Sequence, residues 1–176
     1  MKIRDLTFAA MFTALTAAMA QIYFYLPIAG VQFTLQTLAV FLCGAVLNKK
    51  SAVLSMTAYI LLGTFGVPVF SKFMGGPAVL LGLTGGFVFS FPVMAFLIAF
   101  AAEKFGRKWY VPVMSMTVSL VVCYLFGAGW YSITANVSLV KSLLTVAVPF
   151  IPVDLLKIVP AVIVTVAVRK PLEKLM

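Results

Sequence analysis

Long runs of apolar residues constrain this chain more than any other feature of its sequence. A helix needs about 20 mostly apolar residues to cross the hydrocarbon core of a bilayer. Only 10% of the 176 residues are charged, whereas soluble domains average about 25%. The sequence therefore predicts an all-α integral membrane protein, with a single transmembrane domain over residues 1–176. Its six expected transmembrane helices are 6–26, 32–47, 51–66, 84–102, 110–128 and 146–168.

The first three stretches depart from a simple spanning helix. The N-terminal stretch follows basic residues and contains Ala18-Met19-Ala20, as the cleavage region of a signal peptide does. Its apolar run continues to Leu26 without a polar region, so we expect a retained membrane helix. The second and third stretches are short, and we expect these helices to tilt or to end below the membrane surface.

The basic residues indicate the topology. If the N-terminus is cytoplasmic, ten of the 13 lysines and arginines fall on the cytoplasmic side, as the positive-inside rule requires. Lys72 and Lys141 fall outside, and Lys157 lies within a span. Six helices with both termini in the cytoplasm therefore explain the net charge of +9 without nucleic acid. The ten cytoplasmic residues are Lys2, Arg4, Lys49, Lys50, Lys104, Arg107, Lys108, Arg169, Lys170 and Lys174.

Catalytic and metal-binding side chains are scarce. The chain has no histidine, so no Ser-His or Cys-His pair can form. Its two cysteines, Cys43 and Cys123, lie in apolar runs, where cysteine behaves as a small hydrophobic residue. No Gly-Lys dipeptide occurs, so the chain lacks a Walker A loop. The sequence predicts no enzyme, no metal site and no bound cofactor.

Two charges interrupt the last apolar stretch. Asp154 and Lys157 are spaced i, i+3, which places them on one face of a helix. Each would cost about 2.5–3.5 kcal/mol at the centre of a lipid-facing helix, so they must face the protein interior or a watery cavity. We expect a ligand-binding pair near the outer side. A mutually satisfied structural ion pair and a proton relay are the alternatives, and the lack of a second buried acid counts against the relay.

Polar residues also open the second stretch. Gln32, Thr34, Gln36 and Thr37 follow one another within residues 31–41. In hydrocarbon such groups need partners. They would either form hydrogen bonds between helices or make the polar wall of a small-molecule pocket.

Glycines cluster on the predicted outer side. Seven of the chain's 12 glycines fall between Gly63 and Gly86. Pairs such as Gly75-Gly76 allow tight turns and close backbone approach. This segment would be either a packed re-entrant loop or a lid over an outward-facing site. Lys72, within it, would clamp a ligand carboxylate or be an exposed loop residue.

Two further groups have alternative interpretations. The last outer connection contains Trp130, Tyr131 and Asn136. They would either form part of an aromatic belt at the membrane interface or line a site for a ring-shaped ligand. Ala10, Ala14 and Ala18 form a small-residue stripe on the first helix, for packing within the protein or for docking another membrane protein. These three alanines are spaced i, i+4, i+8, so they lie on one face of the helix.

Five sequence blocks together resemble the BioY family, the biotin-specific substrate-binding (S) components of energy-coupling-factor (ECF) transporters. Their order and spacing make the resemblance specific, and it extends from the second helix to the sixth. The blocks are FTLQTLAVFLCGAVL (33–47), LLGTFGVPVF (61–70), GG (75–76), LGLTGGFVFSFPVMAFLIAF (81–100) and PFIPVDLLK (149–157).

The resemblance implies a six-helix S-component fold in the bacterial cytoplasmic membrane, with an outward-facing site for biotin as the transported ligand. It implies a transmembrane coupling (T) subunit and two ATPase (A) subunits as partners, docked through Ala10, Ala14 and Ala18. The Asp-x-x-Lys of the family contacts the ligand, and here it is Asp154 and Lys157. Together with the residues above we expect ligand contacts from Asp154, Lys157, Gln36, Thr34, Phe70, Gly75, Gly76, Thr84, Trp130, Tyr131, Asn136 and Lys72.

The sequence departs from the family pattern at three points. Val153 precedes Asp154 where the family usually has glycine. The family's loop before Gly-Gly is usually glycine-rich, whereas here residues 71–74 are Ser, Lys, Phe and Met. Leu83–Phe87 stands where the family usually has Pro-Thr-Gly-Gly-Tyr. Lys72 would then supply a charge for the ligand carboxylate that relatives take from elsewhere. An S component for another small vitamin, a stand-alone carrier or channel, a membrane enzyme and a protein-binding scaffold are the alternatives.

Overall fold

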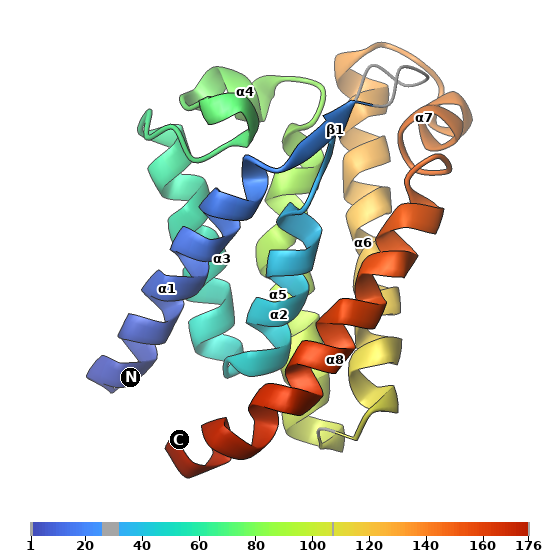
Figure 1. Ribbon diagram of the computed structural model, residues 1–176. Helices are drawn as coiled ribbons and strands as arrows, with labels where there is room; N and C mark the ends of the chain where they lie inside the picture. Colours follow the sequence, from blue (N-terminus) through green and yellow to red (C-terminus); the bar gives the residue numbers. More distant parts are fainter. Residues whose placement is uncertain (1, 26–31, 107, 176) are drawn as a thin grey trace.

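The computed structural model describes residues 2–25, 32–106 and 108–175, and side chains are described outside Tyr25, Gln32 and residues 169–175. The described chain is nearly all helical (Figure 1). The elements in chain order are α1 (Ile3–Ala20), β1 (Tyr23–Tyr25), β2 (Gln32–Thr34), α2 (Gln36–Val46), α3 (Lys49–Thr64), the 3-10 helix η1 (Ser71–Phe73), α4 (Pro77–Leu81), α5 (Gly85–Phe105), α6 (Tyr110–Thr134), α7 (Leu139–Val146) and α8 (Ile151–Leu175).

The long helices lie side by side and give the molecule two distinct ends (Figure 1). Strands β1 and β2, helix α4 and helix α7 gather at one end, which we call the hairpin end. The start of α1 and the last turns of α8 lie at the opposite end, which we call the termini end. The α2–α3 and α5–α6 connections are also at the termini end, so the basic residues Lys49, Lys50 and Lys108 lie there. One ion pair, Lys49–Glu103 at 3.2 Å, joins α3 to α5 at this end.

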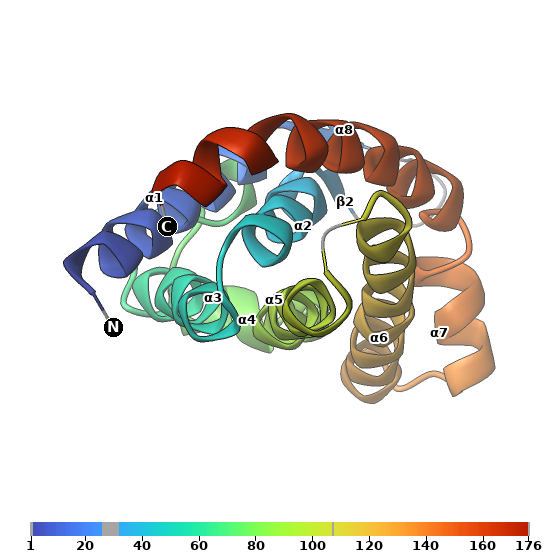
Figure 2. The same cartoon turned by 90° about the horizontal axis from the view of Figure 1, so that it is seen from below.

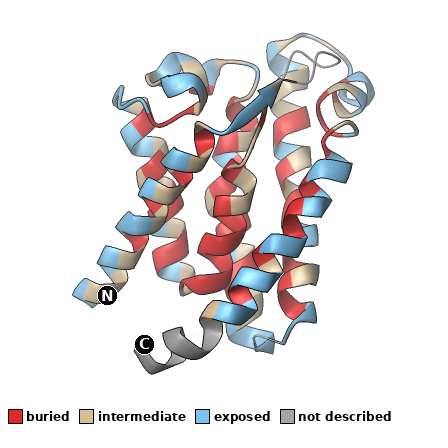
Figure 3. Ribbon diagram, viewed as in Figure 1, coloured by how far each residue is buried: buried red, intermediate tan, exposed pale blue. Residues whose placement is uncertain are grey.

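Helix α2 occupies the middle of the bundle (Figure 2). It lies between α1 and α8 on one side and α3 and α5 on the other, and nine of its 11 residues are buried. A helix that is apolar on all sides is stable only when other helices cover it. Gly44 permits this, because a Cβ there would lie 2.8 Å from Ile98 Cβ and 2.9 Å from the Ala95 carbonyl oxygen. Figure 3 colours most of α2 as buried, whereas α1 and α8 alternate between buried and exposed residues.

The prediction of an all-α chain is wrong at the hairpin end. Helix α1 stops at Ala20 and α2 begins at Gln36, so the predicted helices 6–26 and 32–47 are each too long. Between them β1 and β2 pair antiparallel, with Tyr23 opposite Thr34 and Phe24 opposite Phe33. Aromatic residues favour strands as well as apolar helices. Hydropathy alone therefore could not separate the two.

Four described helices are long and apolar enough to cross a membrane: α1, α5, α6 and the 151–168 part of α8. Helix α2 has 11 residues and α3 has 16, so these two fall short of that length. Helix α6 continues to Thr134, beyond the predicted end at 128. Trp130 and Tyr131 are therefore helical, and the prediction that they belong to a connection is wrong.

The contact at Gly44 leads to a stability prediction. Gly44→Ala should lower the stability of the folded protein by about 1–3 kcal/mol, as overpacking of a close-packed core does. Thermal unfolding in detergent would measure this as a lower melting temperature. Gly129→Ala is the matched control, because a Cβ at Gly129 in α6 has nothing within 4 Å. Equal melting temperatures for both variants would contradict the packing argument.

Candidate functional site

A cavity opens at the hairpin end among α2, α5, α6, α8 and the loop after α3. Its volume is about 120 Å³, counted as the space open to the centres of water molecules. A single water needs about 10–15 Å³ when the volume is counted in this way. The space therefore suits a small organic molecule. The polar residues that line it are Thr34, Gln36, Thr37, Ser71, Thr84, Asp154 and Lys157, and the aromatic ones are Phe33, Phe70, Phe87, Phe91, Tyr124 and Phe150. The remaining lining residues are Met74, Val79, Val88, Cys123 and Val146.

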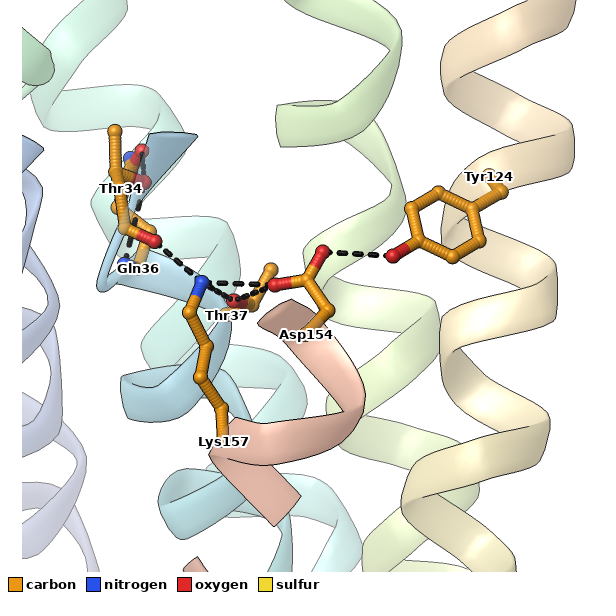
Figure 4. Close-up of polar contacts among 6 residues, drawn as sticks. All are labelled: Thr34, Gln36, Thr37, Tyr124, Asp154 and Lys157. Atoms are coloured by element: carbon orange, nitrogen blue, oxygen red, sulfur yellow. Dashed lines mark hydrogen bonds and ion pairs between the residues drawn. The ribbon is translucent and has the colours of Figure 1, made fainter. Parts of the chain in front are cut away.

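The two charges of the last helix both line this cavity and point toward each other (Figure 4). Asp154 stands in the first turn of α8, and Lys157 follows three residues later on the same face. Lys157 Nζ lies 2.8 Å from Asp154 Oδ1, and the two residues are only 6% and 5% exposed. Buried charges of this kind are stable only when paired and hydrogen-bonded. The ion pair therefore offsets much of the cost of burying both charges.

The ammonium group of Lys157 has partners for all of its protons. Nζ donates to the Thr34 carbonyl oxygen at 2.6 Å, to Thr37 Oγ1 at 2.7 Å and to Asp154. An ammonium has three donors, so none remains unused. Nζ also lies 3.7 Å from the centre of the Phe33 ring, a cation–π distance. Any further acceptor must therefore replace one of these partners.

The carboxylate of Asp154 is nearly saturated as well. Oδ1 accepts from Thr37 Oγ1 at 3.0 Å in addition to Lys157, and Oδ2 accepts from the Tyr124 hydroxyl at 2.8 Å. A carboxylate offers about four acceptor positions. Among the described residues three are used, which leaves a position on Oδ2. The pair could therefore accept one N–H from a ligand without losing a protein contact.

Gln36 combines the two roles that its sequence position suggested. Its Nε2 donates to the Tyr59 hydroxyl at 2.6 Å, which donates to the Val69 carbonyl oxygen at 3.0 Å. Its Oε1 accepts from Thr34 Oγ1 at 2.8 Å. The side chain thus joins α2 to α3 and lines the cavity at the same time.

Two glycines leave the space that aromatic side chains of the cavity lining occupy. A Cβ on Gly63 in α3 would collide with the ring of Phe70, and one on Gly127 in α6 would collide with the ring of Phe87. Phe70 meets the Tyr59 ring edge-on, with centroids 5.5 Å apart. Phe33 and Phe150, which also line the cavity, stack with centroids 6.1 Å apart and planes 14° apart. These rings give the cavity flat, apolar walls, and the Lys157 ammonium lies against one of them, the Phe33 ring.

Half of the predicted ligand-contact residues line this cavity. Six of the 12 do so: Asp154, Lys157, Thr34, Gln36, Phe70 and Thr84. The other six do not, namely Lys72, Gly75, Gly76, Trp130, Tyr131 and Asn136.

The residues outside the cavity have other contacts. Lys72 is exposed, with Nζ 5.9 Å from the Tyr23 ring centre. Trp130 Nε1 donates to the Gly82 carbonyl oxygen at 2.9 Å. Tyr131 packs against the cluster that contains Phe33 and Phe150.

Backbone geometry accounts for the others. Asn136 is exposed and has φ +53°, so it turns the chain after α6. A Cβ on Gly75 would lie 2.6 Å from the Val67 carbonyl oxygen, and Gly76 has φ +96°. These glycines hold the loop between α3 and α4 rather than line the cavity.

Sequence reasoning missed Tyr124 as a site residue. Its hydroxyl lies in the middle of the apolar stretch 110–128, and a buried tyrosine hydroxyl usually needs a hydrogen-bond partner. A tyrosine in an apolar stretch could therefore have indicated a polar partner inside the bundle. Phe33, Phe87, Phe91 and Phe150 carried no signal, because the chain has 16 phenylalanines.

The alanine stripe lies on the outside of the molecule. Ala10, Ala14 and Ala18 are exposed. The opposite face of α1 is buried, and there Thr13 Oγ1 lies 2.9 Å from the Ser55 carbonyl oxygen of α3. Within the part of the chain that the structure describes, the stripe is therefore not a packing face, and docking of another membrane protein stays a prediction.

Known proteins share this sequence and fold. A family model described as the BioY family matches residues 1–174. "Biotin transporter BioY" of Thermotoga maritima is 38% identical over 169 residues, which cover 95% of this chain and 96% of that protein. "Probable biotin transporter BioY" of Pyrococcus horikoshii is 37% identical over 164 residues, which cover 93% and 95%.

A solved structure agrees over nearly the whole chain. The S-component for biotin from an ECF-type ABC transporter matches with a TM-score of 0.89 at 26% identity, covering 96% of this chain and 92% of that one. The resemblance seen in the five sequence blocks is therefore confirmed, and the chain belongs to the BioY family.

Proposed function

We propose that the chain is the biotin-binding S component of an ECF transporter. The observation that carries the proposal is the buried Asp154–Lys157 pair on the wall of an aromatic cavity. A structural ion pair needs no cavity beside it. The similarity to biotin transporters and to an S-component for biotin supports the choice of ligand.

The chemistry of biotin suits this cavity. Its ureido ring offers two N–H donors and one carbonyl acceptor, and its thiophane ring is apolar. Asp154 Oδ2 retains a position for an N–H group, and the flat walls at Phe33 and Phe150 would cover the ring. The ureido carbonyl would accept from Lys157 by replacing one of its present partners. In a cavity shielded from water these polar contacts are stronger than at a surface.

We place the chain in the bacterial cytoplasmic membrane as one domain with six spanning helices. Helices α2 and α3 would complete the count, since neighbours cover α2 on all sides. The termini end would face the cytoplasm, because the described basic residues Lys49, Lys50 and Lys108 lie there. The cavity, at the hairpin end, would then face outward.

Partners would supply the energy for transport. The sequence has no Walker A loop, so ATP hydrolysis would belong to two A subunits. The exposed stripe of Ala10, Ala14 and Ala18 would let a helix of the T subunit approach closely. The chain itself would be neither an enzyme nor a holder of cofactors or metals. An S component for another small vitamin is the second candidate, because Ser71 and Met74 line the cavity within the segment that departs from the family pattern.

Direct titration tests the ligand. The protein purified in detergent should bind biotin tightly and saturably, and should not bind thiamine or riboflavin. Isothermal titration calorimetry would measure the three affinities on one preparation. Binding of thiamine or riboflavin in place of biotin would favour the second candidate. Folded protein that binds none of the three would refute the proposed function.

Substitution of the charged pair tests the site. Asp154→Asn and Lys157→Met should each weaken biotin binding by about 1–3 kcal/mol, the usual cost of leaving a buried polar group without its partner. The double variant separates the interpretations, because removing both charges of a purely structural pair is often neutral. If the pair contacts the ligand, the double variant should still bind biotin more weakly than the wild-type protein does.

Thr117→Val is the control for this series. Thr117 is exposed on α6 and bonds only to the Val113 carbonyl oxygen in the described contacts, so its loss should leave affinity unchanged. Wild-type affinity in the double variant, with folding checked by melting temperature, would show that the pair is structural.

Labelling tests the orientation. Lys141→Cys on α7 and Lys50→Cys at the start of α3 place exposed thiols at opposite ends of the molecule. A membrane-impermeant maleimide added to intact cells should modify Lys141→Cys and reach Lys50→Cys only after lysis. The native chain is the control, since Cys43 and Cys123 are buried. The reverse labelling pattern would contradict an outward-facing cavity.

A further inference from the structure

A tight turn in the wall of the cavity has an unusual sequence for its shape. Phe70 N–H donates to the Met74 carbonyl oxygen at 3.0 Å, and the Met74 N–H reaches the Ser71 carbonyl oxygen at 3.4 Å. The two central residues, Lys72 and Phe73, have φ of +61° and +55°. Turns with two positive φ angles are the type I′ kind and strongly prefer Asn and Gly at these positions. The turn over residues 70–74 is therefore strained.

This turn forms part of the candidate binding site. Phe70, Ser71 and Met74 line the cavity, and Phe70 is only 2% exposed. Phe73 itself points away and is 71% exposed. A change in the shape of the turn would move the cavity wall. Something must hold it in a conformation that its own residues disfavour.

Gln21 makes the contacts that can hold it. Gln21 follows the last residue of α1, and its Oε1 accepts from the Phe73 N–H at 2.9 Å. Its Nε2 donates to the Phe70 carbonyl oxygen at 3.0 Å and to the Ala17 carbonyl oxygen at 3.2 Å. One amide thus bonds to the Phe70 carbonyl oxygen, which precedes the strained residues, and to the N–H of Phe73, which is one of them. These bonds fix the turn to the end of α1, as a neighbouring strand would.

We propose that Gln21 is a positioning residue for ligand retention: it holds the strained turn over residues 70–74 as a wall of the cavity. Gln21 does not line the cavity, so it acts through Phe70 and the turn. The proposal deepens the proposed function and rests on it for the ligand. Loss of the amide should let the turn relax and should release bound ligand faster.

Dissociation of radiolabelled biotin from the purified protein tests this. Gln21→Met keeps the length of the side chain and removes both bonds. It should raise the dissociation rate constant about tenfold, which corresponds to about 1.4 kcal/mol. In a Phe73→Asn background the same substitution should have less than about a third of that effect, because asparagine adopts positive φ more readily than phenylalanine. A purely structural role of Gln21 would give the same effect in both backgrounds.

A second measurement does not depend on the ligand. Cys123 lines the cavity, whereas Cys43, the other thiol, does not. In ligand-free protein, Gln21→Met should speed modification of Cys123 by a small thiol reagent about tenfold, as the same loss of about 1.4 kcal/mol predicts. Modification of Cys43 should be unchanged. Wild-type protein that fails to bind biotin would refute the proposed function, and this measurement would still decide the role of Gln21.

The outcomes that overturn the proposal are specific. They are an unchanged dissociation rate in Gln21→Met, an equal effect in the Phe73→Asn background, or equal acceleration at both cysteines. If Gln21→Met does not fold, Gln21→Glu replaces it, because a glutamate keeps the acceptor for Phe73 and loses the donor to Phe70. A wild-type dissociation rate in Gln21→Glu would overturn the proposal as well.

Discussion

The buried ion pair between Asp154 and Lys157 is the interaction on which the arrangement of the hairpin end depends. An uncompensated charge at this depth costs several kcal/mol. The compensating groups come from three other elements: Thr37 from α2, the Thr34 carbonyl oxygen from β2 and the Tyr124 hydroxyl from α6. The pair is therefore stable only where these elements converge on the first turns of α8. The same convergence leaves the cavity beside it.

The sequence predicted the parts of this arrangement that have a high energetic cost in a membrane. Asp154 and Lys157 stand out because charged residues in hydrocarbon are rare, and Gln36 stands out because an amide needs partners there. The β1–β2 hairpin was not predictable in this way, because Tyr23–Tyr25 is as apolar as a helix end. Gln21 was not singled out, although it fell inside the predicted helix 6–26, because the sequence does not reveal which groups its amide contacts. Its contacts reach Phe70 and Phe73, about 50 residues along the chain, and only the fold brings them together.

The glycines illustrate the difference between a composition signal and its cause. Their cluster between Gly63 and Gly86 suggested either a packed re-entrant loop or a lid over an outward-facing site. In the structure Gly63 leaves room for the Phe70 ring, and a Cβ on Gly85 would collide with the Leu80 carbonyl oxygen. Gly76 does need the freedom of a positive φ. Glycine thus allows close packing at Gly63 and Gly85 and a positive φ at Gly76. The sequence alone does not distinguish these two roles.

The dense packing around α2 limits how a bound molecule can move. Below the cavity, toward the termini end, the described side chains of Val40, Phe41 and Met94 are fully buried. A void among α2, α5, α6 and α8 measures only about 10 Å³, about the space of one water. Among the described residues a solute beside Asp154 therefore meets solid protein rather than a channel. A molecule held in the cavity could therefore move toward the termini end only if the helices around α2 moved apart.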